Sequence, residues 1–333
     1  MNNKNKLFTI VLILCVISLL LGILSPVNKK IQSKKNSVSI KEIVAQNNKI
    51  AVISLDGVIS SESAKTVFGE EENSSLVALS ALNAAEDDKN VKGVILRINS
   101  PGGTVGMSQR LYSAVINLRK KKPVIAVMDD IATSGGYYVA SAADRIVALP
   151  GTMTGSIGVI MSTIDAHELL SDKLGIRDNV IKSGEYKDIG SSTRPMTDAE
   201  HELLQDMVND SFDQFREAII KGRIERKDKY APEKRKLTIA NLDKYADGRV
   251  FTGRQAVEYG FIDSIGGSRE ARAMMIDILK AQRIDVSKDS FVSYGKSSNF
   301  FSSLGINPKS SSIESFLPQS LKYSKKPLYL WEY

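Results

Sequence analysis

The sequence predicts an α/β fold with a parallel sheet, and two observations lead to this prediction. First, short runs rich in Val and Ile are apolar along their whole length, as strands covered on both faces of a parallel sheet are. Second, segments with helical spacing of apolar residues lie between these runs, so strands and helices alternate and right-handed crossovers are expected. The expected strands are Ile50–Ile59, Val91–Ile98, Pro123–Met128, Arg145–Pro150 and Ser156–Ser162.

The expected helices follow in chain order. Leu76–Glu86, Gly106–Lys121 and Asp165–Lys173 separate the strands, and a long helix opens with the capping box Thr197-x-x-Glu200. We interpret the apolar stripe of this long helix as a packing face; it consists of Leu204, Met207, Val208, Phe212, Phe215 and Ile219. Three further helices close the domain, near Ala240–Tyr245, Arg254–Tyr259 and Arg269–Ala281.

The N-terminus predicts a membrane anchor. Residues 7–25 contain no charge, and at ~1.5 Å per residue they just span a hydrocarbon core of ~30 Å. A cleaved signal peptide would have an apolar region of only ~7–15 residues and a small-residue cleavage site, and none follows Ser25. We therefore expect a stub at 1–6 in the cytoplasm, an uncleaved helix at 7–25, a polar linker at 26–48 and a folded domain at 49–285.

The charge distribution supports a membrane location and excludes a basic groove for nucleic acid. Of the 45 basic residues, eight lie in residues 1–49 together with a single acid, and the rest of the chain carries equal numbers of basic and acidic residues. The net charge of +7 therefore belongs to the N-terminal arm. More lysines follow the apolar span than precede it, which by the positive-inside tendency would keep the folded domain in the cytoplasm. The only cysteine is Cys15, so the domain has no disulfide.

Residues 286–333 are rich in Ser, carry scattered aromatic residues and end in KKPLYLWEY, which is typical of a flexible tail. Its leucine, tyrosine and tryptophan side chains are also those of an extended peptide substrate. The tail could therefore enter the groove of its own chain or of a neighbour and compete with substrate. A disordered end or a partner-binding strand is the alternative.

Ser134 is the first candidate for chemistry. It follows the strand Pro123–Met128 and precedes two glycines that begin an expected helix, Gly135 to Ala143. A helix N-terminus directs unpaired N–H groups and partial positive charge at whatever lies beside it, so the Gly135 N–H could stabilise an oxyanion. An ordinary N-cap serine is the alternative interpretation.

A second glycine pair lies at a neighbouring strand end. Pro101-Gly102-Gly103 follows the strand Val91–Ile98 and leads into a helix, at the edge where open α/β sheets bind ligands. Together with Ser134 it could supply the other half of an oxyanion hole. Neither pair has the spacing of a dinucleotide or phosphate motif, so no nucleotide cofactor is expected, and we predict no metal site.

The base is the remaining question. His167 and His201 lie near helix starts, where histidines are ordinarily solvated, and we interpret neither as catalytic. A lysine can activate a serine if burial lowers the lysine pKa. Lys187 lies in a Gly-marked polar segment after an expected strand at Asn179–Ile181, but the neighbouring Glu185 and Asp188 oppose a lowered pKa unless their side chains point elsewhere.

Four motifs in this order resemble the signal peptide peptidase A family: NSPGG, ATSGGYYVASAAD, TGSIGVIMS and SGEYKDIGSS…RPMT. Members are Ser–Lys serine proteases with a Clp-protease/crotonase-type fold, and the chain is similar to the short bacterial form. The resemblance covers about Lys49 to Ala281. It implies that Ser134 is the nucleophile, Lys187 the general base and Ser156 the residue that hydrogen-bonds the lysine amine. It also implies that Gly102, Gly103 and Gly135 bind the oxyanion.

The resemblance further implies a homo-oligomeric ring, octameric where described, in which adjacent subunits share each active site. Substrates would be remnant signal peptides and other unfolded polypeptides. The family places its catalytic domain on the extracytoplasmic side of the cell membrane, against the lysine bias. Two alternatives from other classes are a crotonase-type acyl-CoA enzyme and a non-catalytic membrane scaffold.

Overall fold

A computed structural model describes residues 47–62, 65–66, 69–70, 73–226, 230, 237–295 and 327–330. The predicted anchor at 7–25 lies outside these residues. Within the described ranges, no helix is both long enough and apolar enough to cross a membrane.

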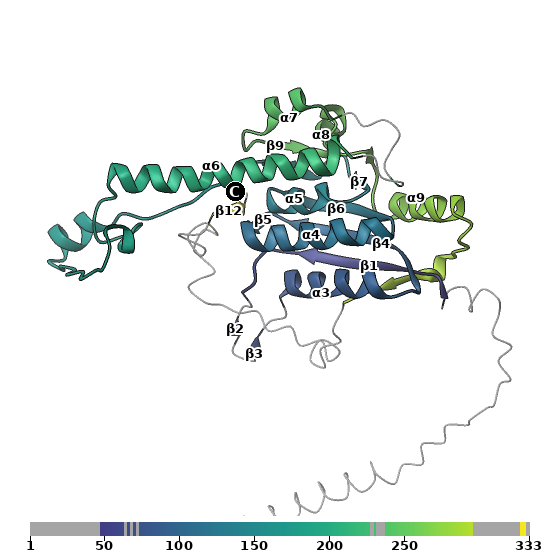
Figure 1. Ribbon diagram of the computed structural model, residues 1–333, viewed down its shortest axis with the longest axis horizontal. Coiled ribbons are helices and arrows are strands. Elements are labelled where there is room, and N and C mark those ends of the chain that lie inside the picture. The colour runs from purple at the N-terminus through teal and green to yellow at the C-terminus, as the bar shows by residue number, and fades with distance from the viewer. Residues whose placement is uncertain are drawn as a thin grey trace, which may run out of the picture. The chain divides into compact units, whose positions relative to one another are not determined.

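An α/β domain with a mostly parallel sheet confirms the predicted fold class (Figure 1). The central strands are β1 (Lys49–Asp56), β4 (Val91–Ser100), β6 (Val124–Thr133) and β7 (Arg145–Ala148), which pair in parallel. The strand order is β10-β7-β6-β4-β1-β11, where β10 is Ser264–Ile265 and β11 is Phe291–Ser293. At the far end of β6, β8 (Met153–Gly155) continues the sheet and pairs antiparallel with β9 (Val250–Thr252).

Helices cover both faces of this sheet. One face packs against α3 (Ser74–Asp87), α4 (Val105–Lys121) and α5 (Gly135–Ser141) in a single apolar core. The other face packs against α9 (Ser268–Ala281) through Ala271, Met275 and Leu279. Because β4 and β6 are covered on both sides, their sequences are apolar nearly throughout.

The long helix α6 (Asp198–Ile219) joins the core by its C-terminal half only. Thr197 and Glu200 form the predicted capping box at its start, whereas Phe215 and Ile219 are buried near its end. The π-helical turn η3 (Ile220–Ile224) follows, and α7 (Ile239–Tyr245) and α8 (Gly253–Tyr259) complete the domain. In Figure 1 the N-terminal half of α6 extends beyond α4 and α5, together with the segment that precedes it.

Several expected boundaries are corrected. β6 runs on to Thr133, because Arg97 pairs with Asp129 at 2.6 Å and lets an acidic residue lie within a strand. Ser156–Ser162 is not a strand, since the backbone turns at Gly155 and Ser156, which both have positive φ. Asn179–Ile181 has no neighbouring strand in this chain and is irregular.

The expected tail boundary after residue 285 is also corrected. β11 pairs in parallel with β1 and extends the main sheet, after the short 3-10 turn η4 (Lys288–Ser290). A further strand, β12 (Leu328–Leu330), pairs antiparallel with β5 (Gly102–Thr104). Parts of the predicted tail therefore belong to the folded domain. A separate small pair joins β2 (Lys65–Thr66) to β3 (Gly69–Glu70).

Candidate active site

Ser134 lies at the turn from β6 into α5 and is the N-cap of that helix. Its φ of 51° and ψ of −116° are a strained conformation for a non-glycine residue, of a kind that clusters at active sites. The Ser134 N–H donates to the Gly155 carbonyl at 2.8 Å, which fixes the turn. The side chain is buried, and its Oγ has no hydrogen-bond partner among the described residues. A buried hydroxyl without a partner is costly and marks a position built for another group.

Glycine amides from two segments lie beside this serine. Ile59 N–H donates to the Gly102 carbonyl at 2.7 Å and holds one edge of β5. The Gly102 N–H donates to Ser100 Oγ at 3.1 Å, so Gly102 is not free to bind an oxyanion. A Cβ on Gly135 would lie 3.1 Å from the Gly103 nitrogen, so these two backbones are in contact. Because Gly135 opens α5 and lacks an intrahelical acceptor, Gly103 and Gly135 are the candidate oxyanion donors.

The C-terminal strand β12 occupies the other edge of β5. Tyr329 lies opposite Gly103 in the antiparallel register. On its far side β12 forms a bridge with Ile160, where Leu328 donates at 3.0 Å and accepts at 3.1 Å. These tail residues therefore lie in an extended groove between β5 and Ile160. This confirms that the tail can enter the groove of its own chain.

Ser156 lies one residue beyond the Gly155 carbonyl that holds Ser134. It is buried, with a φ of 48°, and its N–H donates to the Arg249 carbonyl at 2.7 Å. The structure thus brings Ser134, Ser156, Gly103 and Gly135 to one place at the ends of β5, β6 and β8. Three of these residues came from the short glycine-containing motifs of the sequence.

Lys187 is not brought to this place by its own chain. It is exposed in the 3-10 turn η2 (Glu185–Asp188), after the π-helical turn η1 (Leu169–Lys173). Figure 1 shows that the segment before α6 follows the N-terminal half of that helix, away from α5. Since Ser134 Oγ has no described partner, no hydrogen bond joins the two groups in this chain.

The acid next to Lys187 points away from it. Asp188 accepts from Lys182 Nζ and Arg194 Nη2, each at 2.7 Å, and these two cations hold the pKa of Asp188 well below its usual range. Arg194 also pairs with Glu200 at 2.5 Å, and with the Thr197 N–H it lowers the pKa of Glu200 to about 2. The Asp188 carboxylate is therefore already neutralised, which removes one sequence-based objection to Lys187 as a base.

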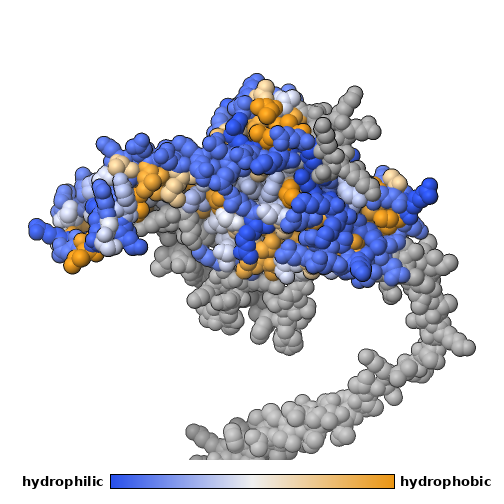
Figure 2. All heavy atoms as spheres, viewed as in Figure 1, coloured by the Kyte–Doolittle hydropathy of each residue, from blue (hydrophilic) through white to orange (hydrophobic). Residues whose placement is uncertain are grey.

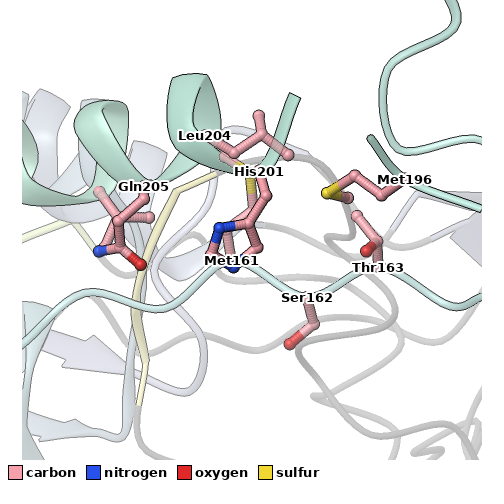
Figure 3. A pocket seen from close by; sticks show the side chains of 8 residues that line it. Met161, Ser162, Thr163, Met196, His201, Leu204 and Gln205 are labelled. Atoms are coloured by element: carbon pink, nitrogen blue, oxygen red, sulfur yellow. The ribbon is translucent and has the colours of Figure 1, made fainter. Parts of the chain in front are cut away.

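Neither histidine approaches Ser134 through a described contact. His167 is paired with Asp165 at 2.6 Å in the exposed segment, and this pairing raises the His167 pKa. His201 lines a cavity of about 520 Å³ between α6 and residues 161–163 (Figure 3). The cavity is largely apolar, with Met161, Met196 and Leu204 in its wall. It begins next to Ile160, so it continues the groove that holds β12.

A strained serine beside two backbone amides, under an extended peptide strand, defines a serine-nucleophile peptidase of the acyl-transfer type. The comparisons agree. The model of peptidase family S49 matches residues 116–282, a range that contains Ser134, Ser156 and Lys187. This chain belongs to peptidase family S49, which confirms the resemblance that its motifs indicated.

Several named relatives are similar over most of the domain. A protein provisionally named signal peptide peptidase SppA from Enterococcus faecium is 35% identical over 72% of this chain and 65% of its own length. A provisionally named protease of Synechocystis is 38% identical over 67% of this chain and 72% of its own. The chloroplastic serine protease SPPA of Arabidopsis thaliana is 34% identical over 58% of this chain and 27% of its own.

The structure also contains residues of the site that the sequence did not reveal. Tyr138, Ser211 and Phe215 surround the side chain of Tyr329, and Arg194 fixes the segment that carries Lys187. Tyr138 stands inside the SGGYY motif, which was a usable signal. Ser211 and Phe215 belong to a helix whose stripe has the pattern of ordinary packing.

Proposed function

We propose that this protein is a membrane-anchored serine endopeptidase in which Ser134 is the nucleophile and Lys187 the general base. The observation that carries the proposal is the buried Ser134 Oγ, which lacks a partner among the described residues and lies beside the amides of Gly103 and Gly135. Such a hydroxyl needs a base that a single chain does not provide.

We infer that Lys187 comes from a neighbouring copy of the chain. The segment that carries it, together with the start of α6, exposes large apolar side chains: Ile164, Leu169, Leu174, Ile176, Val180, Ile181, Tyr186, Leu203 and Met207. Apolar surface gathers at this end of the molecule in Figure 2. Side chains of this kind are stabilised when another subunit covers them. Burial in that contact would also lower the Lys187 pKa toward neutrality, as a general base requires.

The proposed mechanism is acyl transfer. The neutral Lys187 amine accepts the Ser134 proton while Oγ bonds to the peptide carbonyl carbon, and the carbonyl oxygen becomes an oxyanion held by the Gly103 and Gly135 N–H groups. The resulting ammonium then protonates the amide nitrogen as its bond to carbon breaks. Water, deprotonated by Lys187, attacks the acyl ester and releases a carboxylic acid, and the proton returns to Ser134. The Ser156 hydroxyl orients the amine.

The proposed substrates are remnant signal peptides and other unfolded polypeptides at the membrane. The uncharged segment at 7–25 supports an anchor, and the groove beside Ile160 opens into the apolar cavity lined by Met161, Met196 and Leu204, which suits an apolar peptide. We propose a homo-oligomeric ring, an octamer by analogy with the family, with the catalytic domain on the extracytoplasmic side.

The test is complementation between two inactive variants. Ser134→Ala and Lys187→Ala should each abolish cleavage of an apolar peptide without unfolding the domain. When the two variants are co-expressed, mixed assemblies contain sites that pair an intact Ser134 with an intact Lys187 from the neighbour, and activity should return to a fraction of the wild-type value. If mixed assemblies are inactive while wild type cleaves, the two residues do not act across subunits.

Covalent labelling provides the second readout. A fluorophosphonate should label wild type at Ser134 and should not label Ser134→Ala. A wild-type protein in which Ser134 stays unlabelled would contradict the assignment of the nucleophile, and would favour the acyl-CoA enzyme or the scaffold.

A further inference from the structure

The carbonyl group of Tyr329 lies where a scissile carbonyl would have to lie. Its oxygen would be 1.9 Å from a Cβ on Gly102 and 3.0 Å from a Cβ on Gly135, so it fills the space that these two glycines leave open. Val105 N–H donates to the Pro327 carbonyl at 3.4 Å. Hydrogen-bonded pairs recur every second residue in an antiparallel ladder, so the next pair along is Gly103 with Tyr329. The Tyr329 carbonyl therefore faces both candidate oxyanion donors.

The side chain of Tyr329 fills a closed pocket behind this point. Its ring stacks on Tyr138 with centroids 5.0 Å apart at 22°, and it contacts Phe215 at 4.6 Å. Its hydroxyl donates to the Ser211 carbonyl of α6 at 2.7 Å. The side chain is fully buried. We call the site formed by Tyr138, Phe215 and the Ser211 carbonyl the tyrosine pocket.

The chemistry of this pocket is selective. Two aromatic walls favour a flat ring, and the carbonyl at the closed end accepts a hydrogen bond that only a ring hydroxyl can reach. Phenylalanine would fit between the walls but forfeit this bond. An aliphatic or small side chain would lose the ring contacts and leave part of the pocket empty. Ordinary packing of the tail would explain the buried ring, but not the carbonyl positioned at the glycine amides.

We propose that the tyrosine pocket selects the residue on the N-terminal side of the cleaved bond, that its preferred residue is tyrosine, and that Tyr329 occupies it as a tethered substrate-like ligand. This inference rests on the proposed peptidase function and adds its substrate preference. Leu328, which bridges to Ile160, and Pro327 would then mark the two preceding substrate positions.

Binding tests the pocket without catalysis. In the full chain carrying Ser134→Ala and Tyr329→Ala, the pocket is vacated and the nucleophile removed. Three peptides, acetyl-Lys-Lys-Pro-Leu followed by Tyr, Phe or Ala at the C-terminus, are compared by calorimetry. We expect the Tyr peptide to bind roughly 3- to 10-fold more tightly than the Phe peptide, the usual worth of one hydrogen bond. The Ala peptide should bind at least about 100-fold more weakly. Equal affinities would overturn the proposal, and any residual competition from the tail affects all three peptides alike.

Cleavage tests its connection to the reaction. The Tyr329→Ala full chain is assayed on internally quenched peptides that differ only at the residue before the expected cleavage site. Tyr should give the highest kcat/KM, followed by Phe, then Leu. Cleavage without this order would overturn the selectivity. If the binding order holds but no peptide is cleaved, the pocket stands and the proposed peptidase function fails.

A matched pair of variants then tests the walls. Tyr138→Leu, added to Tyr329→Ala, removes the stacking ring and should reduce the preference for Tyr over Leu by at least about 10-fold. Tyr112→Leu makes the same change in a ring that contacts Tyr138 at 5.0 Å but has no ring contact with Tyr329, and it should leave the preference unchanged. A preference that falls equally in both variants would indicate general loosening of the core and would overturn the assignment.

Discussion

At the scale of single residues, the site depends on atoms that are missing as much as on those present. Gly102 has a φ of 102°, a conformation that favours glycine, and its open side holds the Tyr329 carbonyl. We have inferred that this is the position of a scissile carbonyl. A methyl group there would meet that oxygen at 1.9 Å, and the contact is with backbone, which cannot move aside easily.

Gly102→Ala should therefore lower kcat/KM by at least about 100-fold, because both strain and collision oppose substrate binding. Gly106→Ala is the matched control in the same motif, since a Cβ at Gly106 meets nothing within 4 Å; it should keep wild-type activity. Peptide cleavage and circular dichroism are measured for both. A Gly102→Ala enzyme that is folded and fully active would show that the substrate does not bind at this turn.

Single-residue chemistry was predictable from sequence wherever it was local. Ser134, Gly135 and Gly103 lie in two short motifs, and each could be placed at a strand end without knowing the fold. The tyrosine pocket could not be predicted, because Tyr138, Phe215 and Tyr329 come from three distant segments. Gly102 was expected to be an oxyanion donor, and only the structure shows that Ser100 Oγ accepts its N–H.

At the scale of elements, Arg194 joins the turn that carries Lys187 to the start of α6. It pairs with Asp188 on one side and Glu200 on the other. Because Lys187 is adjacent to Asp188, this junction defines where the lysine is presented. It lowers the pKa of both acids below their unfolded values, so its contribution to stability is present above about pH 4.5. That contribution is lost as the pH falls toward about 2, where Glu200 titrates in the folded state.

Arg194→Ala should therefore lower Tm at pH 7, and the difference from wild type should shrink as the pH falls below about 4.5. The same variant should reduce kcat/KM, since the Lys187 turn loses its anchor. Lys221→Ala removes an exposed helical pair with Glu217 at 2.9 Å and should change Tm little at any pH, as such pairs contribute little. A Tm difference for Arg194→Ala that stays constant from pH 7 to pH 3 would contradict this role.

Elements were predictable where the apolar pattern was long and were missed where pairing depended on distant partners. α3, α4 and α6 begin and end close to their expected positions, and the Thr197 capping box was visible in the sequence. The expected strand at Asn179–Ile181 has no partner strand in this chain. β11 and β12 were missed because they are short and find their partners, β1 and β5, far back in the chain.

At the scale of the whole molecule, the most exposed apolar residue marks the surface that we expect a second copy to cover. Ile181 is 100% exposed, in the same segment as Lys187. An isoleucine side chain buried in a subunit contact contributes about 1.5–3 kcal/mol, and a carboxylate at the same place is strongly unfavourable. If this segment delivers Lys187 to the neighbour's Ser134, then assembly and activity must be lost together.

Ile181→Asp, studied as the full chain in detergent, should shift the sedimentation coefficient to that of a smaller species and abolish peptide cleavage. Its circular dichroism spectrum should remain that of wild type, because the side chain contacts nothing in its own chain. Ile265→Asp is the matched control: Ile265 is 41% exposed in β10, far along the chain from this segment, and the change should leave both assembly and activity intact. An Ile181→Asp protein that sediments as a single chain and still cleaves peptides would require the base to come from the same subunit as Ser134.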